Sequence, residues 1–172
     1  MDLVKLKEFL TAQNLPEFRY RQIVKNYYSG RYISFDQMTD LSLDLRSKLN
    51  SQFSLYSVFE EKVVGDQSTK KVLLKLNDGQ RIESVLMNYD DWITACVSSQ
   101  VGCALNCQFC ATGKMGFVRN LTPEEIIDQI IYWNQKIYPS FVSRIVFMGM
   151  GEPFLNWNNL LKALEIINSS TG

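Results

Sequence analysis

The chain has 172 residues, 46% of them hydrophobic, and its 18 basic and 18 acidic side chains balance. A chain of this length buries roughly two thirds of its unfolded surface, so we expect a true core, and the charge balance excludes binding driven by overall charge while allowing a local basic patch. Histidine is absent, which excludes Ser-His and Cys-His nucleophilic schemes and every mixed Cys/His zinc site.

Residues 1–52 are predicted to form a small helical domain. Helical periodicity appears in VKLKEFLTAQ, in EFRYRQIVKNYY after Leu15-Pro16, and in LSLDLRSKL after Asp40. Tyrosines are interleaved with the basic residues of this region, which are Lys5, Lys7, Arg19, Arg21, Lys25, Arg31, Arg46 and Lys48. The pattern suits contact with nucleic acid, but a solvated helix face explains it equally well.

Residues 53–91 are predicted to be a β-strand and hairpin region. YSVFEEKVV, KVLLKL and RIESVLM have the composition of strands, and Asp78-Gly79 between the last two predicts a hairpin. In RIESVLM, the alternation of a strand puts Glu83 on the same face as Val85 and Met87. A carboxylate on a buried apolar face suits a general base, whereas an exposed strand glutamate is the simpler interpretation.

Residues 92–172 predict two successive βα units of an α/β domain. A strand at 92–97 is followed by a loop and by the helix LTPEEIIDQIIYWNQKI, whose start is marked by Thr122 as N-cap, Pro123 at the first position and Glu125 completing a capping box. RIVFMG, residues 144–149, is typical of a buried parallel strand, and NLLKALEII of a second helix. Ligands of such sheets lie in the loops that follow the strands.

The first of these loops holds a cluster of cysteines. All four cysteines lie between positions 96 and 110, and Cys103, Cys107 and Cys110 form a C-x3-C-x2-C run. They are too close together to staple a domain, so they are predicted to be ligands or reactive thiols rather than disulfides. Structural zinc sites of four cysteines usually combine two C-x2-C pairs, and only one is present. A [4Fe-4S] cluster held by three cysteines would leave one iron open to a non-protein ligand.

The second loop carries Gly149-Met150-Gly151-Glu152-Pro153. Glycines let the backbone approach a ligand closely, and the carboxylate of Glu152 can bind an ammonium group. A tight turn is the simpler interpretation of this segment alone. Its predicted place at the same edge as the cysteines favours a shared binding site.

Taken together, these motifs resemble those of radical S-adenosylmethionine (SAM) enzymes, and most closely the RNA adenine-C2 methyltransferases of the RlmN type with their adenine-C8 relatives of the Cfr type. The resemblance lies in CVSSQVGCALNCQFCATGKMGFVRNLTPEEI, GMGEPFLN, DGQRIESVL and SFDQMTDLSLDLRSKL, and so extends through nearly the whole chain. It implies an α/β fold, the first part of a radical SAM partial (β/α)6 TIM-like barrel, preceded by the helical domain and the hairpin region.

The resemblance also implies cofactors, residue roles and a reaction. The residues are Cys103, Cys107 and Cys110 for a [4Fe-4S] cluster, Gly151 and Glu152 for S-adenosylmethionine, Glu83 as proton acceptor and Cys96 as resolving thiol. In this family a second cysteine is methylated, and a 5'-deoxyadenosyl radical abstracts hydrogen from that methyl group. The carbon radical adds to the adenine ring, Glu83 would take the ring proton, and Cys96 would attack the methyl-bearing sulfur to release the product.

The resemblance further implies a monomer that acts on ribosomal and transfer RNA, with an electron donor such as flavodoxin or ferredoxin. The sequence shows neither an apolar leader nor an apolar run near the roughly 18 residues of a membrane span, so we expect a cytoplasmic protein. Family members continue for roughly as long again, to the methyl-carrying cysteine, and no cysteine follows Cys110. We therefore expect an N-terminal fragment that is inactive alone; the alternatives are an adenine-C8 enzyme and an RNA-binding module with a structural metal.

Overall fold

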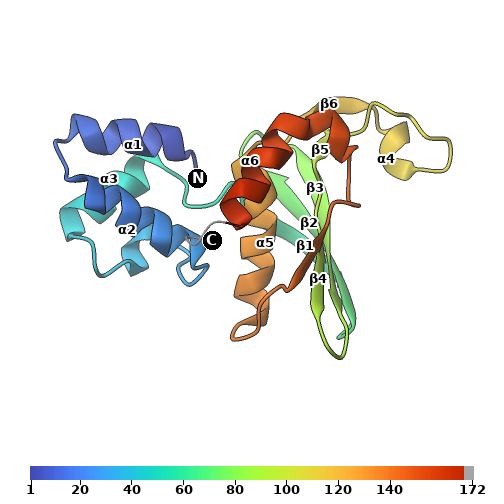
Figure 1. Ribbon diagram of the computed structural model, residues 1–172, viewed down its shortest axis with the longest axis horizontal. Helices are drawn as coiled ribbons and strands as arrows, with labels where there is room; N and C mark the ends of the chain where they lie inside the picture. Colours follow the sequence, from blue (N-terminus) through green and yellow to red (C-terminus); the bar gives the residue numbers. More distant parts are fainter. Residues whose placement is uncertain (169–172) are drawn as a thin grey trace.

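The computed structural model describes residues 1–168, as a helical module beside a mixed α/β unit (Figure 1). The helices are α1 Leu3–Ala12, α2 Glu17–Tyr28, α3 Leu43–Gln52, α4 Ala111–Lys114, α5 Pro123–Ile137 and α6 Trp157–Ile167, with 3-10 turns η1 Phe35–Gln37 and η2 Pro153–Asn156. The strands are β1 Val58–Gly65, β2 Thr69–Leu76, β3 Arg81–Asn88, β4 Ile93–Cys96, β5 Gln100–Gly102, β6 Phe117–Asn120 and β7 Arg144–Val146. None of the helices formed by residues 1–168 combines the length and apolar character that a membrane span requires.

The helical module confirms the three helices predicted in residues 1–52. Asp2 caps α1, because its side chain accepts from the N–H of Lys5, and Ser42 caps α3 in the same way from Leu45. The fully buried side chains of the module are Leu6, Ile23, Tyr27, Phe35, Met38 and Leu49. The domain boundaries at 52 and 91 stay predictions, and residues 169–172 of the predicted 92–172 domain lie outside the described residues.

The main sheet has the strand order β1-β2-β3-β4-β7. β1 to β4 run antiparallel, and the predicted hairpin joins β2 to β3 at Gly79, which has a positive φ of 84°. β7 then pairs with β4 in parallel, so the predicted βα units are confirmed. The prediction that RIVFMG forms a buried strand is wrong for these residues: β7 spans Arg144–Val146 and is partly exposed, since it is the edge strand of this sheet in residues 1–168.

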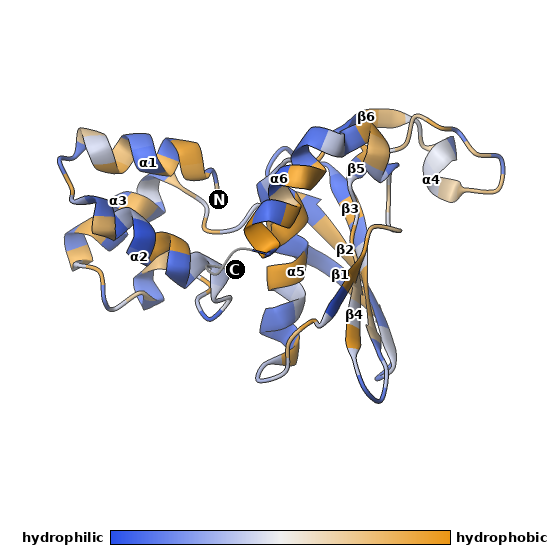
Figure 2. Ribbon diagram, in the orientation of Figure 1, coloured by the Kyte–Doolittle hydropathy of each residue, from blue (hydrophilic) through white to orange (hydrophobic). Residues whose placement is uncertain are grey.

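Helix α5 covers one face of the sheet. Thr122 and Glu125 form the predicted capping box, and the buried hydrophobic side chains of α5 are Ile126, Ile127, Ile130, Ile131, Tyr132 and Trp133. The indole N–H of Trp133 donates to Ser84 Oγ at 2.9 Å, on the β3 face that also buries Ile82 and Leu86. Figure 2 shows hydrophobic and polar residues alternating along α5 and α6, as expected of helices that bury one face.

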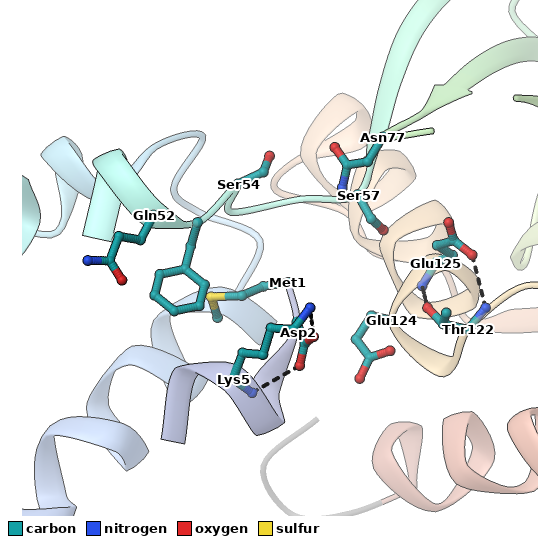
Figure 3. Close-up of a pocket in the computed structure, with 11 residues that line it drawn as sticks. Met1, Asp2, Lys5, Gln52, Ser54, Ser57, Asn77, Thr122, Glu124 and Glu125 are labelled. Carbon is teal, nitrogen blue, oxygen red and sulfur yellow. Dashed lines mark hydrogen bonds and ion pairs between the residues drawn. The ribbon is translucent and has the colours of Figure 1, made fainter. Parts of the chain in front are cut away.

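The helical module is joined to α5 through the buried carboxylate of Asp128. Asp128 accepts hydrogen bonds from the Tyr27 hydroxyl of α2 at 2.5 Å and from Ser57 N and Oγ at 2.7 and 2.5 Å. A cavity of about 300 Å³ lies between the two parts of the molecule, lined among others by Asp2, Lys5 and Glu124 (Figure 3). None of the predicted site residues lines this cavity, so it is separate from the candidate site.

Candidate functional site

The loops that follow β4 and β7 meet at one edge of the sheet. Because the two strands are parallel, their carboxyl ends point the same way, as the sequence predicted. The backbone N–H groups of Ser99 and Gln100 both donate to the carbonyl of Met150, at 2.9 and 3.2 Å, and the N–H of Gly149 donates to Val97 at 3.2 Å. The Gly-Met-Gly-Glu-Pro loop is therefore bound directly to the segment that leads into the cysteine loop.

The two glycines of this loop are required by packing. A Cβ at Gly149 would lie 2.7 Å from Ser98 Oγ, and one at Gly151, whose φ is +96°, would lie 2.5 Å from Gln100 Cβ. The Glu152 carboxylate caps η2 by accepting from the N–H of Phe154 at 3.2 Å. The backbone of the Gly149–Pro153 loop thus approaches residues 97–100 closely. The role of Gly151 and Glu152 in binding S-adenosylmethionine stays a prediction.

Ser98 connects this loop to β3. Its hydroxyl donates to the Glu83 carbonyl at 2.6 Å and accepts from the N–H of Met150 at 2.8 Å, and it is fully buried. The amide of Gln129, from α5, binds the backbone N–H and carbonyl of Ser98 at 2.8 and 3.0 Å. Sequence reasoning missed Ser98 and Gln129; the available signal was the polar Ser98-Ser99-Gln100 run directly after a buried strand.

Glu83 and Cys96 share the face of the sheet opposite α5. Cys96 lies directly across from Val85, so Glu83 is one diagonal step away. The predicted alternation of β3 is confirmed, but the face is not buried at Glu83: the Glu83 side chain is 43% exposed and its carboxylate pairs with Lys71 at 2.9 Å. The buried apolar surroundings that would suit Glu83 as a general base are therefore not present in the described residues. Lys71 was not predicted.

Cys96 itself is buried. Burial raises the pKa of its thiol, and a hydrogen bond from the Met148 backbone N–H offsets part of that rise. A raised pKa keeps the thiol protonated near neutral pH. Cys96 is therefore held in its less nucleophilic form.

The other three cysteines lie on a loop that projects away from the helical module (Figure 1). The antiparallel strands β5 and β6 form the base of this loop, which the sequence did not predict, and Cys103 N–H donates to the Gly116 carbonyl at 3.0 Å. Cys103 is buried, whereas Cys107 and Cys110 are partly exposed. Backbone N–H groups of Gly113 and Thr112 lower the pKa of the Cys110 thiol, which favours the thiolate form that metals bind.

The cysteines fit a [4Fe-4S] cluster by donor chemistry. All four are free thiols in the structure. Three thiols within eight positions suit iron–sulfur ligation, but residues 1–168 contain no group of three or more His, Cys, Asp or Glu side chains already arranged to hold a metal. The assignment of Cys103, Cys107 and Cys110 as cluster ligands therefore stays a prediction.

Arg119, at the base of the cysteine loop, fixes β6 to its surroundings. Its guanidinium makes two bonds of 2.8 Å to the carboxylate of Glu125 at the start of α5 and one of 2.7 Å to Asp78 in the β2–β3 turn. Glu125, then Asp78, raise the pKa of the guanidinium. Sequence reasoning missed this residue, since its partners are fixed only when the sheet and helix pack.

Comparison with known proteins identifies relatives of both parts of the chain. Residues 1–55 match the Ribosomal RNA large subunit methyltransferase N-terminal domain, and residues 97–170 match the Radical SAM superfamily. The probable dual-specificity RNA methyltransferases RlmN of Cytophaga hutchinsonii and Chlorobium phaeobacteroides are 43% and 42% identical over 98% and 97% of this chain, and over 47% and 49% of their own lengths.

A solved structure has the same fold. The crystal structure of a radical SAM methyltransferase from Sphaerobacter thermophilus matches with a TM-score of 0.90 and 39% identity, over 100% of this chain and 52% of that one. This confirms the predicted fold as the N-terminal part of the radical SAM methyltransferase fold. The chain spans about half the length of these relatives.

Proposed function

We infer that this chain, which corresponds to the N-terminal half of RlmN-type radical SAM methyltransferases, supplies the cluster-binding loop, the proton acceptor and the resolving thiol of an RNA methyltransferase. The observation that carries the proposal is that Glu83 and Cys96 share one sheet face, at the edge where the Gly149–Pro153 loop meets the approach to the cysteine loop. The helical module would contribute to RNA binding.

In this proposal Cys103, Cys107 and Cys110 hold the [4Fe-4S] cluster, and Gly151 and Glu152 bind S-adenosylmethionine. The bound cofactors supply the radical chemistry that an electrophilic ring carbon requires, because such a carbon has no lone pair for ordinary methyl transfer. Glu83 accepts the proton released from the ring. Cys96 remains a protonated thiol until it is needed to resolve the covalent adduct.

We propose C2 of adenine in 23S ribosomal RNA and transfer RNA as the target, with methyl-cysteine chemistry, a flavodoxin or ferredoxin electron donor, and a monomeric, cytoplasmic protein. We further propose that residues 1–172 do not complete methyl transfer by themselves. All four cysteines lie between positions 96 and 110, and none of them is left to carry the methyl group once the cluster and resolving roles are assigned.

The cluster is tested by anaerobic reconstitution of residues 1–172 with iron and sulfide. We expect about four irons and four sulfides per chain and a broad brown absorbance, which Cys107→Ala loses and the control Cys96→Ala retains. Stoichiometric zinc without labile sulfide, together with RNA binding that S-adenosylmethionine does not affect, would instead support the binding module with a structural metal.

The reaction is tested with a protein that joins residues 1–172 to the C-terminal half found in its relatives. Incubated with RNA and S-adenosylmethionine under reducing conditions, it should yield 5'-deoxyadenosine and C2-methylated adenine. Methylation at C8 would select the Cfr-type alternative, and methylation confined to ribose would contradict the proposal. The same assay on residues 1–172 alone should give no methylated adenine.

A further inference from the structure

A lysine on the neighbouring strand contacts the carboxylate of Glu83. Lys71 Nζ lies 2.9 Å from Glu83 Oε1, with the two side chains 47% and 43% exposed. Lys71 is directly across from Val85, and Val85 is directly across from Cys96. Lys71, Glu83 and Cys96 therefore lie on one face of the sheet, opposite α5.

The backbone of Glu83 is already fixed on both sides. Its carbonyl accepts from the Ser98 hydroxyl at 2.6 Å, and its N–H lies 3.3 Å from the Met150 sulfur. The remaining freedom of Glu83 is in its side chain. Lys71 is the contact that restricts this freedom in the described residues.

Other charged groups near this face do not ion-pair with Glu83 in the described residues. Lys62 on β1 lies directly across from Leu73, which lies directly across from Glu83, so Lys62 is on this face. Arg81 on β3 makes bonds of 2.6 and 2.8 Å to Glu61, and Lys75 on β2 also interacts with Glu61. β4 contributes the neutral thiol of Cys96, and the loop after β7 contributes the Glu152 carboxylate, which caps η2. Among the described cations, Lys71 is thus the one that ion-pairs with Glu83.

We propose that Lys71 is a positioning residue for the reaction, which holds the Glu83 carboxylate aimed along the face shared with Cys96. This inference rests on the proposed function, in which Glu83 accepts the ring proton. A proton acceptor must lie within hydrogen-bond reach of the proton that it takes, and the ammonium of Lys71 fixes where the Glu83 carboxylate lies. A cross-strand pair that merely stabilises the hairpin would change the thermal stability but not the rate of methyl transfer by the folded protein.

The single-turnover rate of methyl transfer, compared with thermal stability, distinguishes these two roles in a protein that contains residues 1–172 and the C-terminal half of its relatives. With Lys71→Met, we expect an about two- to three-fold lower single-turnover rate at saturating RNA. Lys71→Arg should restore the wild-type rate. Lys70→Met is the matched control, since Lys70 lies on the opposite face of the same strand. Equal single-turnover rates for Lys71→Met and Lys70→Met would overturn the proposal.

A second measurement uses residues 1–172 alone and does not depend on activity. Competitive acetylation of amines, quantified by mass spectrometry with Lys70 as internal reference, should be about two- to three-fold faster at Lys71 in Glu83→Gln than in wild type. An unchanged ratio would overturn the pairing itself. If the longer wild-type protein methylates no adenine while the ratio still rises, the proposed function has failed and the ion pair stands as a structural contact.

Discussion

Replacement of Ser98 by alanine tests the connection between β3 and the Gly149–Pro153 loop. The change removes a hydroxyl that is fully buried, and it leaves the Met150 N–H without its acceptor and the Glu83 carbonyl without its donor. Each buried polar group that loses its partner costs about 1–3 kcal/mol, so we expect Ser98→Ala to lower the free energy of unfolding by about 2–4 kcal/mol after local relaxation. For a chain of this size, the melting temperature should fall by on the order of 10 °C.

The adjacent serine provides the control. Ser99 is also buried, but its hydroxyl has no hydrogen-bond partner in the described residues. Ser99→Ala removes an unsatisfied polar group and should leave the free energy of unfolding unchanged or raise it by up to about 1 kcal/mol. Urea denaturation of residues 1–172, followed by circular dichroism, measures both. Equal effects of the two substitutions, or a change below about 0.5 kcal/mol for Ser98→Ala, would refute the reasoning.

Three further predictions concern other parts of the molecule. Tyr27→Phe removes one of the three hydrogen bonds that the buried carboxylate of Asp128 accepts from Tyr27 and Ser57. It should destabilise the chain by about 1.5–3 kcal/mol, measured by urea denaturation, with faster hydrogen exchange in α2; unchanged exchange would contradict it. Arg119→Met leaves a buried glutamate without its counterion and should lower the free energy of unfolding by about 1–3 kcal/mol in the same measurement. Arg81→Met breaks an exposed pair and should have a clearly smaller effect; equal effects of the two substitutions would contradict the prediction. Burial raises the pKa of the Cys96 thiol. The contribution of the neutral thiol to folding stability is therefore complete below the usual cysteine pKa and is lost as pH rises through the raised pKa. Alkylation of Cys96, measured by mass spectrometry, should reach half its maximal rate at a higher pH in the folded chain than in urea.

Predictions from local patterns agreed well with the structure. The segment EFRYRQIVKNYY forms α2 with the predicted bounds, Asp78-Gly79 turns the hairpin, and Thr122 with Glu125 forms the capping box. Each of these depends on residues within a few positions of one another, whose preferred dihedral angles and hydrogen bonds are fixed by the chain itself. The short strands β5 and β6 were missed, because three or four residues are too few to show a period.

The sequence by itself determined the donor set of the candidate site, the order of its βα units and the face of β3 on which Glu83 lies, because these follow from residue type and short-range spacing. Only the tertiary structure decided that Ser98 joins Glu83 to Met150. It also decided that the Glu83 carboxylate is partly exposed and paired with Lys71 rather than buried among apolar side chains. These contacts join strands and loops whose side chains reach one another only after the sheet has formed and α5 has packed on it. Their geometry is therefore a property of the packed sheet and helix, and no local pattern encodes it.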